Sequence, residues 1–154
     1  MATLYSNQKT KWSQNVPSEK IKTNEQHGRI RIAFADITLA SAAIADVIEL
    51  VNLPNGARII DGYLTNAALG ASTTLSVGNA AYKDAAGTVV AAAAASYLAA
   101  TSTSSAARTD AFATIALGAG SVVDANKDGL PITATLAGGT ASGVVQIAVR
   151  YVVD

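Results

Sequence analysis

The segment from Gly143 to Val153 alternates large apolar residues with small or polar ones, and this alternation constrains the fold more than any other feature of the chain. The residues on one side of an extended backbone are Val145, Ile147, Val149, Tyr151 and Val153. Gln146 and Arg150 fall on the other side. Because successive side chains of a β-strand point to opposite faces of a sheet, the pattern predicts a strand with one buried side.

Strand-like segments recur along the rest of the chain, separated by turn residues. They span residues 29–39, 46–53, 57–66, 72–79, 108–116 and 130–136. We expect Leu69–Ser72 to turn between two of them, with Gly70 free to adopt a positive φ. About seven or eight short strands with Gly, Asn and Asp turns predict an all-β fold. Residues 28–154 are therefore expected to form one domain, an antiparallel β-sandwich resembling a jelly roll.

The first strand-like segment has two apolar phases. At its start, the apolar residues on one face are Ile30, Ile32 and Phe34, whereas Arg29 and Arg31 lie on the other face. Farther along, the apolar positions are Ala35, Ile37 and Leu39. We expect the face of Ile30, Ile32 and Phe34 to be buried, and the change of phase predicts a β-bulge near residues 33–35.

The run from Val89 to Ala100 favours a helix. It contains seven alanines, and alanine has the highest helix propensity of all residues. A loop rich in Ser and Thr follows it. We therefore predict one short helix in this part of the chain.

Residues 1–27 have no regular apolar periodicity and predict an extended arm. Residues 1–31 carry six basic and two acidic side chains, a net charge of +4, whereas residues 32–154 carry five basic and nine acidic ones, a net charge of −4. Such a segment is disordered or orders only against a partner, and the alternative is that it crosses its own domain. The candidate contact residues of the arm are Tyr5, Lys9, Lys11, Trp12, Lys20 and Lys22.

Trp12 is the expected anchor of this arm, because a lone Trp in a segment without its own core fits a pocket better than water. The lysines would meet an acidic protein surface. A basic arm could also contact phosphates, but an excess of four charges is modest. We therefore do not expect nucleic acid as a partner.

The residue types that carry most enzyme and metal chemistry are scarce. The chain has no cysteine, and His27 is its single histidine, which excludes thiolate and multi-histidine metal sites. No serine lies in a G-x-S-x-G motif. The carboxylates that could pair are Asp36, Asp46, Glu49 and Asp61, but scattered acids on strand faces are more often solvent-facing. We predict no enzymatic activity and no cofactor.

The chain also lacks a membrane-spanning or secretion signal. Its longest apolar run, Val89–Ala100, is shorter than the ~20 residues that a membrane span needs. The N-terminus is polar, without the apolar stretch of a signal peptide. We expect a soluble protein that is made in a cytosol and does not enter a membrane.

The sequence DANKDG, Asp124–Gly129, matches the opening of a calcium-binding loop. The twelfth position of that loop should be a bidentate Glu, but here it is Thr135. Asp, Asn and Gly are equally typical of a plain turn. A turn is the preferred interpretation, and a weak metal site is the alternative.

Two stretches carry a resemblance to a known family: LPNGARIIDGYLTNAALGASTTLSVGNAAY (Leu53–Tyr82) and VVQIAVRYVVD (Val144–Asp154). They resemble small structural proteins encoded among the head genes of tailed bacteriophages, the head decoration or auxiliary capsid proteins. The likeness covers roughly residues 28–154, with a strand pair, a hairpin around LGASTTLSVG and a C-terminal strand. It implies a virion protein, made in the host cytoplasm, that binds the outside of the major capsid protein lattice as an oligomer and stabilises it.

Two other functions are compatible with this pattern of short strands. A tail, fibre or carbohydrate-binding module would expose an aromatic platform, and the candidates for it are Tyr63, Tyr82, Tyr97 and Tyr151. An enzyme would need a pocket of clustered polar groups.

Overall fold

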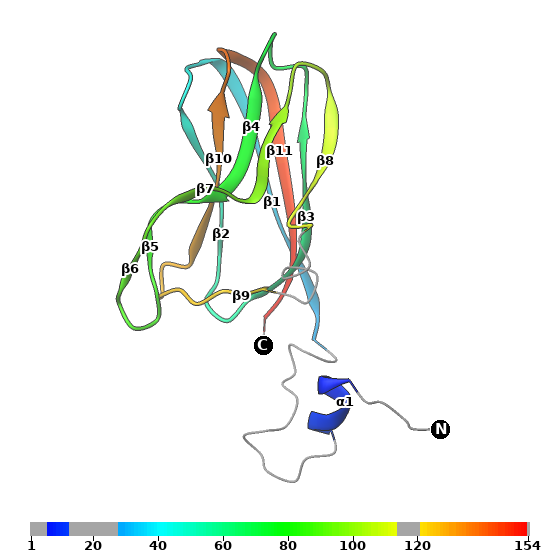
Figure 1. Cartoon of the computed structure of the whole chain (residues 1–154), viewed down its shortest axis with the longest axis vertical. Helices are drawn as coiled ribbons and strands as arrows, with labels where there is room; N and C mark the ends of the chain where they lie inside the picture. The colour runs from blue at the N-terminus through cyan, green and yellow to red at the C-terminus, as the bar shows by residue number, and fades with distance from the viewer. Residues whose placement is uncertain (1–5, 13–27, 114–120, 154) are drawn as a thin grey trace.

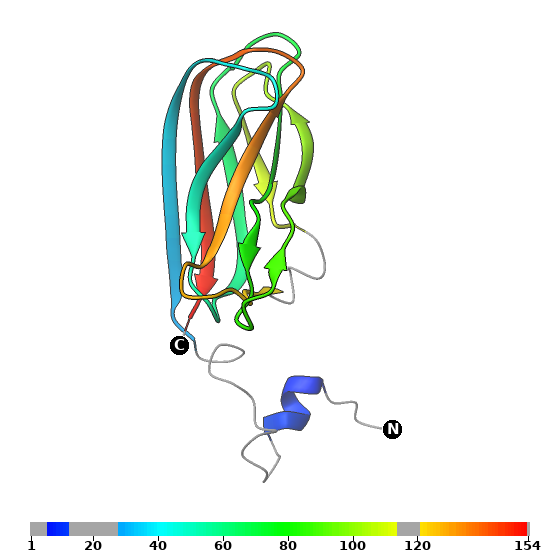
Figure 2. The ribbon, with the colours of Figure 1, turned by 90° about the vertical axis from the view of Figure 1, so that its left-hand side faces the viewer.

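The computed structural model describes residues 6–12, 28–113 and 121–153 of the chain. Its β-strands form two large antiparallel sheets (Figures 1 and 2). The order of the first sheet is β1 (Ile30–Ala42), β11 (Ala141–Val152), β3 (Arg58–Asn66) and β8 (Ala107–Ala111), with β9 (Ser121–Val122) added beside β3. The order of the second sheet is β2 (Val47–Leu53), β10 (Leu130–Ala137), β4 (Thr74–Asn79) and β7 (Ala93–Ser102). A separate hairpin pairs β5 (Tyr82–Lys83) with β6 (Val89–Val90).

This strand order is that of a jelly roll. When the eight strands on the two main paths are numbered along the chain, the first sheet reads 1-8-3-6 and the second reads 2-7-4-5. Every paired strand is antiparallel to its neighbour. Two four-stranded sheets connected in this way are the double Greek key of a jelly roll. The prediction of an antiparallel, jelly-roll-like sandwich is confirmed.

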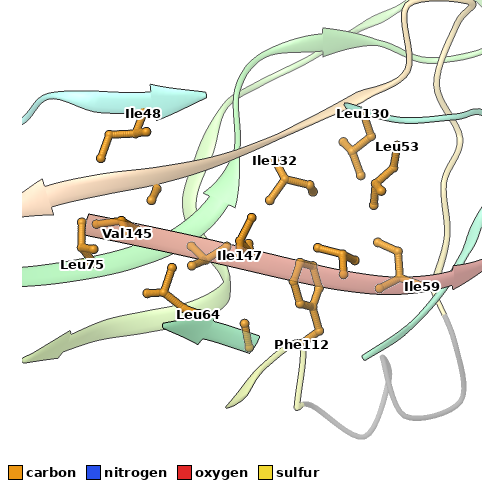
Figure 3. Close-up of a cluster of buried hydrophobic side chains, with 14 of the residues drawn as sticks. Ile48, Leu53, Ile59, Leu64, Leu75, Phe112, Leu130, Ile132, Val145 and Ile147 are labelled. Atoms are coloured by element: carbon orange, nitrogen blue, oxygen red, sulfur yellow. The ribbon is translucent and has the colours of Figure 1, made fainter. Parts of the chain in front are cut away.

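The core lies between the two sheets. Figure 3 shows its side chains converging from both layers; they include Ile59, Leu64, Val145 and Ile147 of the first sheet and Leu53, Leu75 and Ile132 of the second, all buried. The alternation in β11 is confirmed, because Val145, Ile147 and Val149 are fully buried while Arg150 is exposed. Interdigitating side chains from two inner faces are what holds such a sandwich together.

The predicted helix at Val89–Ala100 is wrong, because this run contains β6 and most of β7. Seven of the ten residues of β7 are exposed, and the strand lies at the edge of its sheet beside β4. Small residues suffice at exposed edge positions. Pairing with β4 then outweighs the helix propensity of alanine, which is a weak preference that tertiary context overrides.

The described helix lies elsewhere, in the arm that we expected to be extended. α1 spans Asn7–Trp12. Ser6 caps it, since its side-chain oxygen accepts a hydrogen bond from the backbone N–H of Lys9 at 3.2 Å. Residues 1–5 and 13–27, the remainder of the arm, lie outside the described residues.

The link between β3 and β4 is a crossover between layers. Gly70 has a φ of +143°, as predicted for a turn residue. However, β3 belongs to the first sheet and β4 to the second, so the two strands are not a hairpin. The pair of buried hydroxyls at this crossover is Thr73 and Thr103, whose side-chain oxygens lie 3.0 Å apart.

The predicted bulge near residues 33–35 is also absent from the register of β1. Residues 30 to 39 pair continuously with residues 152 to 143 of β11, and the shift lies between Leu39 and Ala42. One face of β1 therefore points inward along this whole length. That face carries Ala33, Ala35, Ile37 and Leu39, which pack against the core, whereas Ile30, Ile32 and Phe34 face outward.

The strand predicted at Arg108–Ala116 is shorter than expected. β8 ends at Ala111, and the next residue, Phe112, has a φ of +63°. This backbone turn directs the Phe112 side chain into the core, where it is 1 % exposed. Residues 114–120 lie outside the described part of the chain.

Candidate interaction surface

The structure places part of the predicted contact arm. Lys9 is exposed and Lys11 is half-buried, both within α1, and Trp12 is the last residue of this helix. Tyr5, Lys20 and Lys22 lie outside the described residues, as does His27. The role of the arm therefore stays a prediction.

A stripe of large apolar side chains runs along the outward face of β1. Ile30, Ile32 and Phe34 are 61 %, 64 % and 60 % exposed. They account for three of the eight large apolar side chains that are exposed in the described ranges. Isolated exposed apolar residues are ordinary, but a contiguous group on one strand marks an interaction surface. We call these three residues the β1 strip.

Arg150 borders the β1 strip on the neighbouring strand, where it lies opposite Ile32. Its guanidinium donates two hydrogen bonds to the Asp61 carboxylate of β3, at 2.5 and 2.6 Å. Both side chains are nearly half exposed, so this pair organises the outer face more than it stabilises the fold.

The same outer face continues to β8. The Arg108 guanidinium lies 3.6 Å from the centre of the Tyr63 ring, a cation–π contact. Asp110 lies opposite Tyr63 on β8. A shallow pocket of about 200 Å³ lies among these side chains. Arg and Tyr are enriched where proteins bind each other.

A larger groove of about 680 Å³ lies between the β5–β6 hairpin and the adjacent ends of β2 and β10. Its charged lining residues are Glu49, Lys83, Lys127 and Asp128. Opposite charges balance there, and Lys127 is already bound to Asp128 at 2.7 Å. The groove therefore selects neither an anionic nor a cationic ligand.

The Asp124–Gly129 segment forms a turn, as preferred. The backbone N–H of Gly129 donates to the carbonyl of Asn126 at 3.1 Å, and Gly129 has a φ of +80°. The Asp124 carboxylate accepts a hydrogen bond from the backbone N–H of Ala85, and the Asp128 carboxylate accepts from Asn126 and Lys127. The two carboxylates thus serve the turn and the hairpin beside it.

The four tyrosines considered for an aromatic platform lie in different environments. Tyr63 is covered by Arg108, and Tyr97 stacks on Phe112 with ring centres 4.6 Å apart. Tyr82 lines the groove, and Tyr151 packs against the core. Burial, with the nearby Tyr82 phenol as a smaller cause, raises the pKa of Tyr97 to about 12.

The carboxylates considered for catalysis are not gathered into one site. Asp61 is held by Arg150, and Asp46 accepts a hydrogen bond from the backbone N–H of Ala43 at 2.7 Å. Across the described ranges, no three His, Cys, Asp or Glu residues are close enough to hold a metal ion. In the same ranges, no helix is long and apolar enough to cross a membrane.

An eight-stranded double Greek key of this kind occurs in viral capsid and lectin domains, and solved capsid structures contain chains of similar fold. A chain in the capsid of Ralstonia phage GP4 has a TM-score of 0.60 and 22 % identity, with 82 % of this chain and 86 % of that chain covered. A chain in the capsid asymmetric unit of cyanophage Pam1 has a TM-score of 0.58 and 21 % identity over the same shares. A chain in the acid-stable capsid of the Helicobacter pylori bacteriophage KHP30 has a TM-score of 0.53 and 18 % identity, with 80 % and 87 % covered.

At these identities the likeness concerns the fold. No protein-family model matches the sequence, and no curated protein sequence matches it. What the chain shares with these capsid chains is therefore the path of its backbone.

Sequence reasoning identified the residues of the β1 strip but assigned them to the core. The alternation of the following residues could have corrected this assignment. From Ala33 onward the apolar residues Ala35, Ile37 and Leu39 lie on the opposite side of the strand from the β1 strip, and no Gly or Pro separates the two sets. Because an unbroken strand keeps one phase, only one of the two sets can face the core.

Proposed function

We propose that this protein is a bacteriophage virion protein without enzymatic activity, a decoration (cement) protein on the outside of the capsid. One observation carries the proposal. The jelly roll superposes on chains of three phage capsids over at least 80 % of its length. The major capsid protein would be its partner, and neighbouring copies would contact one another as an oligomer.

The surface supports a mechanical role. Only 14 % of the residues are charged, against roughly 25 % in an ordinary soluble domain. Small Ala, Ser and Thr side chains lose little entropy when they are buried against a neighbour. Contacts that form only in the assembled shell stabilise the shell by mass action.

The arm would strengthen attachment. Trp12 is the proposed anchor, because burial of a large aromatic side chain contributes roughly 2–3 kcal/mol. Lys9, Lys11, Lys20 and Lys22 would each add less than about 1 kcal/mol as exposed ion pairs. We therefore expect Trp12→Ala to weaken attachment more than Lys9→Ala does.

The test uses virions and capsids that lack this protein. Labelled antibody should decorate the capsid surface of intact particles in electron micrographs, and purified protein should rebind the deficient capsids. Label on tails or fibres instead would refute the decoration role and support a tail protein. Deletion of residues 2–26 should leave a cooperative melt but reduce rebinding, and undiminished rebinding would assign attachment to the body alone.

A further inference from the structure

The β1 strip inverts the usual arrangement of a strand at a protein surface. In an ordinary half-buried strand the large apolar residues face the core and the small or polar ones face water. In the first half of β1 the residues on the inward side of the strand are Arg31, Ala33 and Ala35, of which the two alanines pack against the core, whereas Ile32 and Phe34 point outward. The larger apolar surface of this half of the strand is thus left outside the fold.

The register shows that this inversion is built into the strand. Ten consecutive residues of β1, from 30 to 39, pair with β11 without a shift. A slip by one residue would bury Ile32 and Phe34 but expose Ile37 and Leu39, which pack on the core. The core of the sandwich therefore fixes the outward direction of the β1 strip.

The Phe34 side chain is 60 % exposed. The residue opposite it on β11 is Ala148, whose methyl group is too small to screen an aromatic ring. On the far side β1 is the edge of its sheet. An apolar patch on an edge strand is an aggregation risk unless a partner covers it.

The charges on the face of the β1 strip balance. Arg150, opposite Ile32, is held by the Asp61 carboxylate, and Asp36 is exposed two residues beyond Phe34 on the same face of the strand. Arg29 and Arg31 lie on the other face of β1. The strip therefore favours a partner surface that is apolar at its centre and carries no large net charge at its rim.

The size of the strip argues against a second copy of the chain as its sole occupant. Patches of a few apolar side chains expose on the order of 300 Å², whereas each partner of a stable dimer contributes about 800 Å². A patch of this size suits a protein that is held in a capsid lattice by several separate contacts.

We propose that the β1 strip, Ile30, Ile32 and Phe34, is the docking surface of the body on the capsid shell, where it meets an apolar surface of the major capsid protein. This inference rests on the proposed function and assigns a contact to the jelly roll itself, next to the arm. The strip begins three residues after the arm ends, so the two would act as one continuous attachment surface.

The absence of cysteine from the chain permits a direct test by thiol labelling. Single variants Ile32→Cys and Ile44→Cys place a thiol at positions that are 64 % and 58 % exposed. Ile44 lies in the turn after β1, at the opposite end of the strand, and is the matched control. The rate of reaction with a fluorescent maleimide is measured in free protein and in protein loaded on deficient capsids.

We expect capsid loading to slow the labelling of Ile32→Cys strongly and to leave that of Ile44→Cys unchanged. If the wild-type protein binds capsids but Ile32→Cys is labelled equally fast in both states, the docking assignment fails and the proposed function stands. If the wild-type protein does not bind capsids at all, both fail. Concentration-dependent protection of Ile32→Cys without capsids would show that a second copy covers the strip, which also overturns the assignment.

Affinity provides an independent measurement. The double variant Ile32→Ser/Phe34→Ser should bind deficient capsids on the order of tenfold more weakly, or worse, which corresponds to about 1.4 kcal/mol. Val89→Ser, at a position that is 66 % exposed on the β5–β6 hairpin, should bind as the wild type does. Both variants should melt at the wild-type temperature, and equal binding by the two would refute the docking assignment.

Discussion

The two phenylalanines of this chain, Phe34 and Phe112, offer a matched pair for testing where its stability resides. Phe34 is 60 % exposed on β1, and Phe112 is 1 % exposed between the sheets. Replacing each by Ala removes the same atoms. We expect Phe34→Ala to change the free energy of unfolding by no more than about 0.5 kcal/mol, and Phe112→Ala to lower it by about 3–5 kcal/mol.

The large value for Phe112 follows from its surroundings. Its ring stacks on Tyr97 of β7 and also lies against the backbone of β3, where a Cβ added at Gly62 would come within 2.9 Å of the ring. The Phe112 N–H donates to the carbonyl of Tyr97 at 3.0 Å. Gly62 has no side chain that could fill the space left by the ring. The cavity would therefore persist, which places the cost in the upper part of the range for such substitutions.

The assay is reversible unfolding in urea, with thermal melting as a second measurement. For a chain of this size each kcal/mol shifts the melting temperature by about 2–4 °C, so Phe112→Ala should melt roughly 6–20 °C lower. Phe112→Leu should recover most of the loss, because it keeps apolar volume and forfeits mainly the aromatic stacking of about 0.5–1.5 kcal/mol. A loss below about 1 kcal/mol for Phe112→Ala would refute this account of the core. An equal loss for Phe34→Ala would show that the β1 strip belongs to the core.

Three further perturbations follow from described contacts. Gly78→Ala should detach β7 and raise its hydrogen exchange, because a Cβ there would collide with the carbonyl oxygen of Ala93. Gly87→Ala has open space around it but a φ of +88°, so it should strain the β5–β6 turn and leave the exchange of β7 nearly unchanged. Tyr97 should ionise near pH 12 in an absorbance titration, whereas the phenol of the unfolded chain ionises near pH 10. Because the folded state disfavours the phenolate, the stability contributed by neutral Tyr97 is complete below pH 10 and is lost as the pH rises toward 12. The Asp61–Arg150 pair should show a coupling energy below about 1 kcal/mol in a double-mutant cycle with Asp61→Asn and Arg150→Gln, and this energy should be smaller still at high salt. A large, salt-independent coupling energy would mean that the pair is shielded from solvent.

The sequence predicted the fold well where each strand has one buried face. β11 is such a strand, because its apolar alternation leaves a single way to bury the apolar side. β2 does not alternate strictly; its β-branched residues and the PNG turn after it favoured a strand. The prediction failed at β7. Its exposed edge positions are occupied by alanine, a residue that gives no contrast between two faces and favours a helix in isolation.

The candidate site was less accessible to sequence reasoning. Hydrophobicity alone placed Ile32 and Phe34 inside the protein, since pattern arguments assume that the larger apolar face is the buried one. Their outward direction is set by the downstream residues Ile37 and Leu39, through the unbroken pairing of β1 with β11. The crossover from β3 to β4 was missed for a similar reason, because a short turn is compatible with a hairpin and with a change of sheet.

The antiparallel pairing of β1 with β11 has a consequence for the use of this protein as a display scaffold. Ile30 lies opposite Val152, so the entry and the exit of the jelly roll are at the same end of the sandwich (Figure 2). A cargo fused after Val153 would emerge beside the β1 strip and would compete with docking. The turn at Ala43–Asp46 lies at the other end of β1, and its Ile44 side chain is 58 % exposed. A peptide inserted there would point away from the shell.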